Sequence, residues 1–91
     1  MPEATVALLN ASGLHARPAK IFARAAAATT ADVTVSKDGR EVNGKSVLSV
    51  LTLDCHEGDQ IVIRTEGEGA DQALTELVRL VESGLGEAGE G

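Results

Sequence analysis

A histidine lies in a short segment whose neighbours favour phosphoryl chemistry. Residues 13–19 place His15 three positions before Pro18. Because proline lacks an N–H and has a preset φ, Pro18 is predicted to lie in the first turn of a helix. His15 then lies at or beside the N-cap, where backbone N–H groups lack helical partners and the helix dipole is positive. The N–H groups of Ala16 and Arg17, with the Arg17 guanidinium, could hold a phosphoryl group that the imidazole attacks.

The rest of the chain supplies the elements that must position this segment. Hydrophobic periodicity, a hairpin signal at Asp38-Gly39 and an N-cap at Ser46 divide the chain into alternating strands and helices. The predicted strands cover residues 5–9, 32–37, 40–43 and 60–66, and the predicted helices cover 16–28, 47–53 and 70 to just before Gly84. A loop over 10–14 leads into the first helix. The order β-α-β-β-α-β-α predicts an α+β domain of two layers, with helices on one face of an antiparallel sheet.

A chain of 91 residues supports one aliphatic core, because it contains a single aromatic residue, Phe22. We expect one domain over residues 1–84 and a frayed Gly/Glu-rich tail over 85–91. Helical spacing assigns Ile21, Phe22, Ala25 and Ala28 to the core face of the first helix and Ala70, Ala73, Leu74, Leu77, Val78 and Val81 to that of the third. Strand alternation turns Val33, Val35, Ile61 and Ile63 inward.

Composition excludes several classes of function. A net charge of −6 argues against nucleic acid as a partner, since phosphate backbones require a basic surface. No leader and no long apolar run is present, so neither secretion nor membrane insertion is expected. The single cysteine, Cys55, fits a reducing cytoplasm and is expected to be a small buried side chain. We expect no metal site, because Cys55 and His56 are adjacent and His15 has no ligand at a suitable spacing; His56 is expected to be a loop residue.

The run Gly-Leu-His-Ala-Arg-Pro-Ala at 13–19 closely resembles the active-site signature of the HPr family, the histidine-containing phosphocarriers of the bacterial sugar phosphotransferase system. A second segment, residues 45–51, also resembles this family, and Lys20 departs from it. The resemblance implies the strand order 1-4-2-3. It implies that His15 receives a phosphoryl group on Nδ1 from enzyme I and donates it to sugar-specific enzyme IIA components. Such a protein is a stoichiometric carrier rather than an enzyme, and we expect it to be a cytoplasmic monomer without a cofactor.

Ser46 has a structural and a regulatory interpretation. As an N-cap, its hydroxyl satisfies a helix N–H and contributes about 1 kcal/mol. In the family, a serine at this position is a regulatory phosphorylation site in many carriers, which implies a Ser46-specific kinase or phosphorylase and a transcriptional regulator as further partners. A phosphate there would add about −2 charge beside the docking surface.

The second predicted helix carries more apolar residues than one buried face can accommodate. We expect Val47, Leu48 and Leu51 to remain partly exposed as a partner site, unless loops cover them. The cations Lys20 and Arg24 lie with Arg17 on one side of the first helix, where they form either a solvated face or a basic rim for acidic partners.

Two alternatives stay open. One is a carrier for a non-sugar branch, either nitrogen-related or feeding a kinase. The other is a regulatory binding module on the same fold, against which the intact His15 weighs. A generic small-ligand domain offers no reason for the run around His15.

Overall fold

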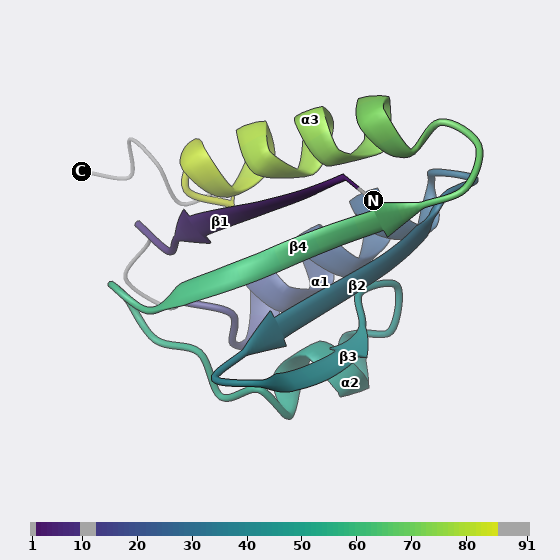
Figure 1. Cartoon of the computed structure of the whole chain (residues 1–91). Coiled ribbons are helices and arrows are strands. Elements are labelled where there is room, and N and C mark those ends of the chain that lie inside the picture. The colour runs from purple at the N-terminus through teal and green to yellow at the C-terminus, as the bar shows by residue number, and fades with distance from the viewer. Residues whose placement is uncertain (1, 10–12, 86–91) are drawn as a thin grey trace.

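The computed structural model describes residues 2–9 and 13–85, which form a four-stranded sheet with three helices (Figure 1). The elements, in order, are β1 (Glu3–Ala7), α1 (Ala16–Ala27), β2 (Asp32–Lys37), β3 (Arg40–Asn43), α2 (Val47–Leu51), β4 (Gln60–Glu66) and α3 (Ala70–Glu82). The predicted order of elements is confirmed. Residues 10–12 of the expected entry loop and 86–91 of the expected tail lie outside the described residues.

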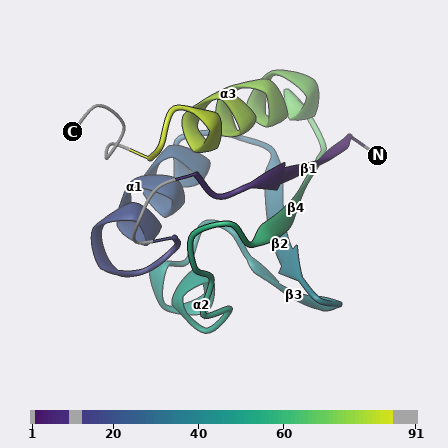
Figure 2. The same cartoon turned by 90° about the vertical axis from the view of Figure 1, so that its left-hand side faces the viewer.

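The sheet order is β1-β4-β2-β3, and every pairing is antiparallel. This confirms both the two-layer α+β prediction and the strand order 1-4-2-3. The helices lie together on one face of the sheet, and the other face is open (Figure 2). The β2–β3 hairpin turns through Asp38 and Gly39, both at positive φ, as a two-residue loop between twisted strands requires.

Strand β1 begins and ends two residues earlier than predicted. Its pairing ends at Ala7, opposite Gln60, because β4 begins there. Pairing at the other end starts early, since the carbonyl of Pro2 already accepts a hydrogen bond from the Thr65 N–H. Helix α2 is also shorter than predicted. The N–H groups of residues 52 and 53 donate to the carbonyls of Ser49 and Val50, three residues back, rather than four residues back as in an α-helix.

The core lies between the sheet and the helices. The inward strand residues Val33, Val35, Ile61 and Ile63 are buried as predicted. On the first helix the expected face is partly wrong: Ile21 is half-buried, and Ala28 is exposed because α1 ends one residue earlier than predicted and Ala28 is its C-cap. Phe22 is fully buried with its neighbours Ala19, Ala23 and Ala26, because small side chains let the helix lie close to the sheet.

Leu85, which the sequence assigned to the tail, is fully buried in the core. Gly84 and Leu85 both have positive φ, and the Leu85 N–H donates to the carbonyl of Leu80. This is how a helix ends when its last carbonyls are capped by a left-handed turn. The chain is thus packed through residue 85.

The segment before α1 is held against the segment that follows α2. The Leu14 N–H donates to the carbonyl of Cys55 over 3.1 Å, and both side chains are fully buried. Gly13 has φ +58, and a Cβ built on it would lie 2.3 Å from the Cys55 carbonyl oxygen. Gly13 is therefore required both for its backbone conformation and for the close approach of the two segments.

We predict that Gly13→Ala destabilises the fold more than Gly58→Ala does. Gly58 also has a positive φ, but a Cβ there meets nothing within 4 Å. Both variants incur the conformational cost, and only Gly13→Ala adds a backbone clash, so the difference in unfolding free energy should be about 2 kcal/mol. Chemical denaturation of the two variants measures it. Equal destabilisation would show that the 13–14 segment is not packed as described.

Candidate functional site

His15 is the N-cap residue of α1, as predicted. Its backbone is extended, with φ −113 and ψ 156, and its side chain makes no capping bond. Pro18 lies in the first turn with its ring fully buried. The imidazole is thereby directed away from the helix it precedes, and 36% of the side chain is exposed. The first N–H groups of α1 have no acceptors within the helix.

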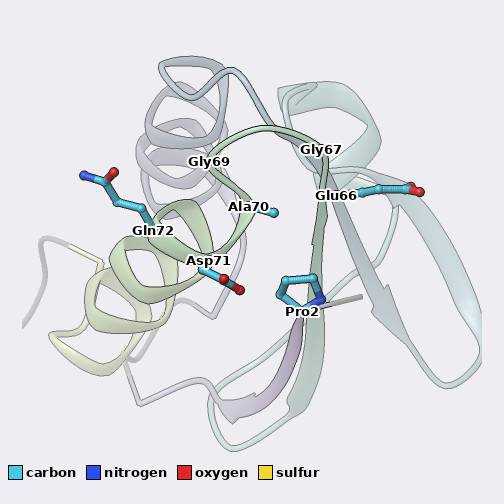
Figure 3. Close-up of a pocket in the computed structure, with 7 residues that line it drawn as sticks. All are labelled: Pro2, Glu66, Gly67, Gly69, Ala70, Asp71 and Gln72. Carbon is cyan, nitrogen blue, oxygen red and sulfur yellow. The ribbon is translucent and has the colours of Figure 1, made fainter.

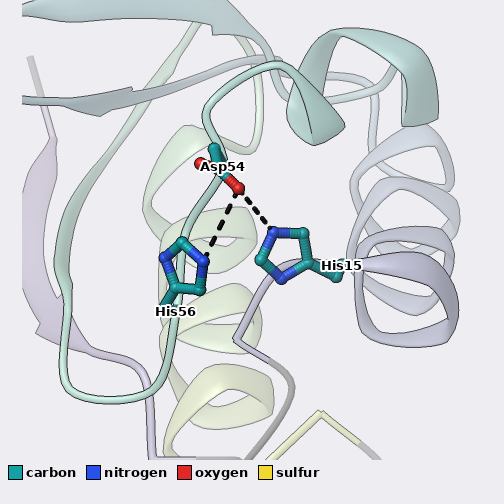
Figure 4. A group of neighbouring side chains, drawn as sticks. All are labelled: His15, Asp54 and His56. Atoms are coloured by element: carbon teal, nitrogen blue, oxygen red, sulfur yellow. Dashed lines mark hydrogen bonds and ion pairs between the residues drawn. The ribbon is translucent and has the colours of Figure 1, made fainter.

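A carboxylate that the sequence analysis did not single out contacts this histidine. Asp54 Oδ1 lies 2.9 Å from His15 Nε2, although 39 residues separate them (Figure 4). A carboxylate can only accept, so Nε2 carries the proton in this contact. In a neutral ring the lone pair then belongs to Nδ1. The hydrogen bond from His15, and next the nearby His56 ring, lower the pKa of Asp54 below its ordinary value.

The backbone after α2 places Asp54 against His15. Asp54 has φ +53, a conformation that aspartate tolerates better than most residues. Two hydrogen bonds hold this turn: the Asp54 N–H donates to the carbonyl of Leu51, and Lys37 Nζ donates to the carbonyl of Asp54 over 3.1 Å. Lys37 also pairs with Asp59 at 3.0 Å. Lys37 therefore contacts both ends of the 54–59 loop.

His56 lies on the other side of Asp54. Its Nε2 is 3.6 Å from the same Oδ1 atom, and the two imidazole rings are 4.9 Å apart between centroids. His56 is a loop residue, as predicted. The premise that His15 has no neighbours suited to a metal is wrong, because folding brings one donor atom each from His15, Asp54 and His56 within 4.8 Å of one another. Regular spacing in sequence could not reveal a cluster that the tertiary fold assembles.

Three cations of α1 are exposed near this site. Arg17, Lys20 and Arg24 lie on one side of the helix, and within the described ranges none of them is paired with an acidic side chain. Their charges are therefore available to a partner or an anion. The first turn of α1 contains no acidic residue that would neutralise them.

Helix α2 packs beside α1 (Figure 2) and carries the exposed apolar residues. Leu48 is 77% exposed, while Val47 and Leu51 are half-buried. Val50 and Leu53 face the core. The expected apolar surface is present, and Leu48 is its most exposed point.

Ser46 is the N-cap of α2. Its Oγ accepts a hydrogen bond from the Ser49 N–H over 3.3 Å, as the capping prediction requires. The preceding Lys45 reaches the end of α1, where its Nζ donates to the Thr29 carbonyl over 3.1 Å. The start of α2 is thus joined to the same helix that carries His15.

A surface hollow and the single cysteine do not form part of the site around His15. A surface hollow of about 500 Å³ lies between the end of β4 and the start of α3, at the opposite end of β4 from the His15 cluster (Figures 1 and 3). Its polar side chains are Glu66, Asp71 and Gln72, which offer no cation for a phosphoryl group. Cys55 is buried, as predicted, and burial raises the pKa of its thiol to about 11, so it is not a thiolate at neutral pH.

Comparison with known proteins agrees with this geometry. The family described as PTS HPr component phosphorylation site matches residues 2–83. The phosphocarrier protein HPr of Streptomyces coelicolor is 50% identical over 91 residues, covering 99% of this chain and 98% of that protein.

Solved structures of HPr and of an HPr-like protein also resemble this fold. HPr from Thermoanaerobacter tengcongensis superposes with a TM-score of 0.92 at 37% identity, covering 96% of this chain and 98% of that one. Crh from Bacillus subtilis, a catabolite repression protein described as a domain-swapped dimer, has a TM-score of 0.74 at 33% identity over 92% of this chain and 97% of that one.

Among the described residues, no helix has the length and apolar character needed to cross a bilayer. The family match covers nearly the whole length of the chain, and the N-cap histidine and the strand order agree with it. The chain belongs to the HPr family, the phosphocarrier proteins of the bacterial phosphotransferase system.

Proposed function

We propose that this chain accepts a phosphoryl group from enzyme I on His15 and passes it to sugar-specific enzyme IIA components. The observation that carries the proposal is the contact between His15 Nε2 and Asp54. This contact supports a ring proton on Nε2 and a nucleophilic lone pair on Nδ1, at the N-terminal, positive end of α1.

The transfer follows from this arrangement. Nδ1 attacks phosphorus in line, and the Nδ1–P bond forms as the bond from phosphorus to the donor's histidine breaks. His15 keeps its proton on Nε2, so the ring gains positive charge, which the Asp54 carboxylate stabilises. The N–H groups of Ala16 and Arg17 and the guanidinium of Arg17 offset the charge on the phosphoryl oxygens.

The reverse transfer to enzyme IIA uses the same contacts. The Nδ1–P bond breaks, and the ring returns to the neutral Nε2–H form. The carrier is phosphorylated or free after each half-reaction, so it turns over only through its partners. We place it in the cytoplasm as a monomer without a cofactor; dimers are described for the T. tengcongensis and B. subtilis relatives.

Partner docking is assigned to the surface formed by α1 and α2. Leu48, with Val47 and Leu51, supplies an apolar centre. The basic rim consists of Arg17, Lys20 and Arg24. An apolar centre with a charged rim suits fast association with acidic partners and short-lived complexes.

Ser46 is proposed as a site of regulatory phosphorylation by an ATP-dependent kinase. Its hydroxyl lies at the start of α2, beside the proposed docking surface. A phosphate of about −2 charge would face the same acidic partners that the basic rim attracts, and would weaken their binding. A transcriptional regulator that recognises this phosphate is a further proposed partner.

We predict that His15→Gln stops the relay of label from phosphoenolpyruvate through enzyme I to enzyme IIA, by at least about a thousandfold, because the nucleophile is lost. The control is His56→Gln, which changes the neighbouring imidazole in the same way and should relay normally. Radiolabel transfer with purified components measures both. Transfer through His15→Gln at the native rate would contradict the proposal.

We predict that Asp54→Asn slows acceptance from enzyme I about tenfold in kcat, with KM changed less than about twofold, because Asp54 positions the ring without touching the reacting atoms. Asparagine keeps the acceptor oxygen and tolerates the positive φ, so the fold is retained. Glu57→Gln removes the same charge from the same loop and should have no effect. A rise in KM alone would assign Asp54 to docking instead.

For Ser46, incubation with an HPr-type serine kinase and ATP should label the wild-type protein and Ser49→Ala equally, and should not label Ser46→Ala. Loss of the N-cap should also lower the unfolding free energy of Ser46→Ala by about 1 kcal/mol. Mass spectrometry locates the phosphate. Labelling of Ser46→Ala would show that Ser46 is not the phosphorylated residue.

A further inference from the structure

We propose that His15, Asp54 and His56 form a binding site for a divalent transition metal of the zinc type, and that metal binding and phosphorylation of His15 exclude each other. The binding site stands on geometry alone, whereas the competition also rests on the proposed function. The three residues offer two imidazole nitrogens and one carboxylate oxygen. This donor set suits zinc and its neighbours in the first transition series rather than Mg²⁺.

The distances fit a shared metal. Zinc holds nitrogen and oxygen ligands at about 2.0–2.2 Å, so adjacent ligands of a tetrahedral site are about 3.3 Å apart. Asp54 Oδ1 lies 2.9 Å from His15 Nε2 and 3.6 Å from His56 Nε2, on either side of that value. All three donor atoms lie within 4.8 Å of one another, so metal binding would have to draw the two imidazole nitrogens together by at most about 1.5 Å.

A second carboxylate, that of Asp59, lies near the other ring nitrogen of His56. While its Nε2 faces the cluster, its Nδ1 lies 3.7 Å from the Asp59 carboxylate (Figure 4 shows the cluster). Asp59 also accepts a hydrogen bond from the His56 backbone N–H over 2.8 Å and pairs with Lys37. Histidines that bind metals commonly donate their second N–H to a carboxylate, and the Asp59 carboxylate, at 3.7 Å, lies near that position but beyond hydrogen-bond distance.

The cluster is open to solvent. The exposed fractions are 36% for His15, 74% for Asp54 and 63% for His56. A metal can therefore enter without unfolding the loop, and solvent can supply the fourth ligand. Of the nearby cations, Lys37 is paired with Asp59, whereas Arg17, two residues from His15, is not paired with an acidic side chain among the described residues.

Competition with phosphorylation follows from the ring's tautomers. Zinc takes the lone pair of His15 Nε2, so the proton leaves Nε2 and the neutral ring holds its single proton on Nδ1. Nδ1 then has no lone pair for phosphorus. The same atom cannot act as nucleophile while the metal is bound, and the net proton count of the neutral ring does not change.

Direct binding tests the site without any phosphotransfer component. Zn²⁺ is titrated into the metal-free full-length chain in competition with a chromophoric chelator. We expect saturable 1:1 binding to wild type and to Cys55→Ala, and at least about tenfold weaker binding to Asp54→Asn and His56→Gln. No saturable binding, equal binding by all variants, or loss of binding in Cys55→Ala would overturn the site.

The competition is tested with enzyme I and phosphoenolpyruvate at a Zn²⁺ concentration that saturates wild type. Zinc should slow phosphorylation of wild type at least about fivefold more than that of His56→Gln, which keeps His15 and Asp54 but lacks the third ligand. Because both proteins meet the same enzyme I, an effect of zinc on that enzyme cancels. Equal slowing would refute the competition, while failure of both proteins to be phosphorylated without zinc would refute the proposed function instead.

Discussion

The position of His15 depends on a contact between two segments that are distant in the sequence, the one before α1 and the one after α2. The Leu14 N–H bonds to the Cys55 carbonyl, and Gly13 allows the two backbones to approach too closely for any side chain. Leu14 and Cys55 are both fully buried, so this contact is fixed from within the core. His15 and Asp54 are the immediate neighbours of Leu14 and Cys55 in the sequence, so this backbone pair brings the two side chains within reach of each other.

The contact between the two segments gives the two ring nitrogens of His15 different roles. One faces a carboxylate whose pKa is lowered, so its negative charge persists well below neutral pH. The other is left to the positive end of α1. A metal that replaces the proton on the first nitrogen would reverse these roles, so the proposed phosphoryl transfer and the proposed metal binding would require opposite tautomers of the ring.

Much of this fold could be predicted from the sequence, because local signals agreed with the tertiary structure. The Asp38-Gly39 turn, the Ser46 cap and Pro18 in the first turn of α1 each depend on a few adjacent residues. The strand order depends on pairing between strands that are distant in the sequence, so it was predicted from the family resemblance and not from local signals. At the first helix the choice of core face failed at Ala28, because α1 ends at Ala27 and Ala28 is its exposed C-cap residue.

The site was only half predictable for the same reason. His15 and Arg17 stand in one short run, whereas Asp54 is 39 residues away from His15 with no pattern that links them. The sequence feature that could have pointed to Asp54 is its position just after a short helix, where the chain must turn back. Only the packing of that turn against residues 13 and 14 shows that its carboxylate reaches the imidazole.

The tautomer of His15 in the free protein tests this account most directly. Long-range ¹H–¹⁵N correlation spectra of the metal-free chain, recorded at a pH where the ring is neutral, distinguish a protonated from an unprotonated ring nitrogen. The account predicts a proton on Nε2 and a lone pair on Nδ1. A neutral ring with its proton on Nδ1 would contradict it.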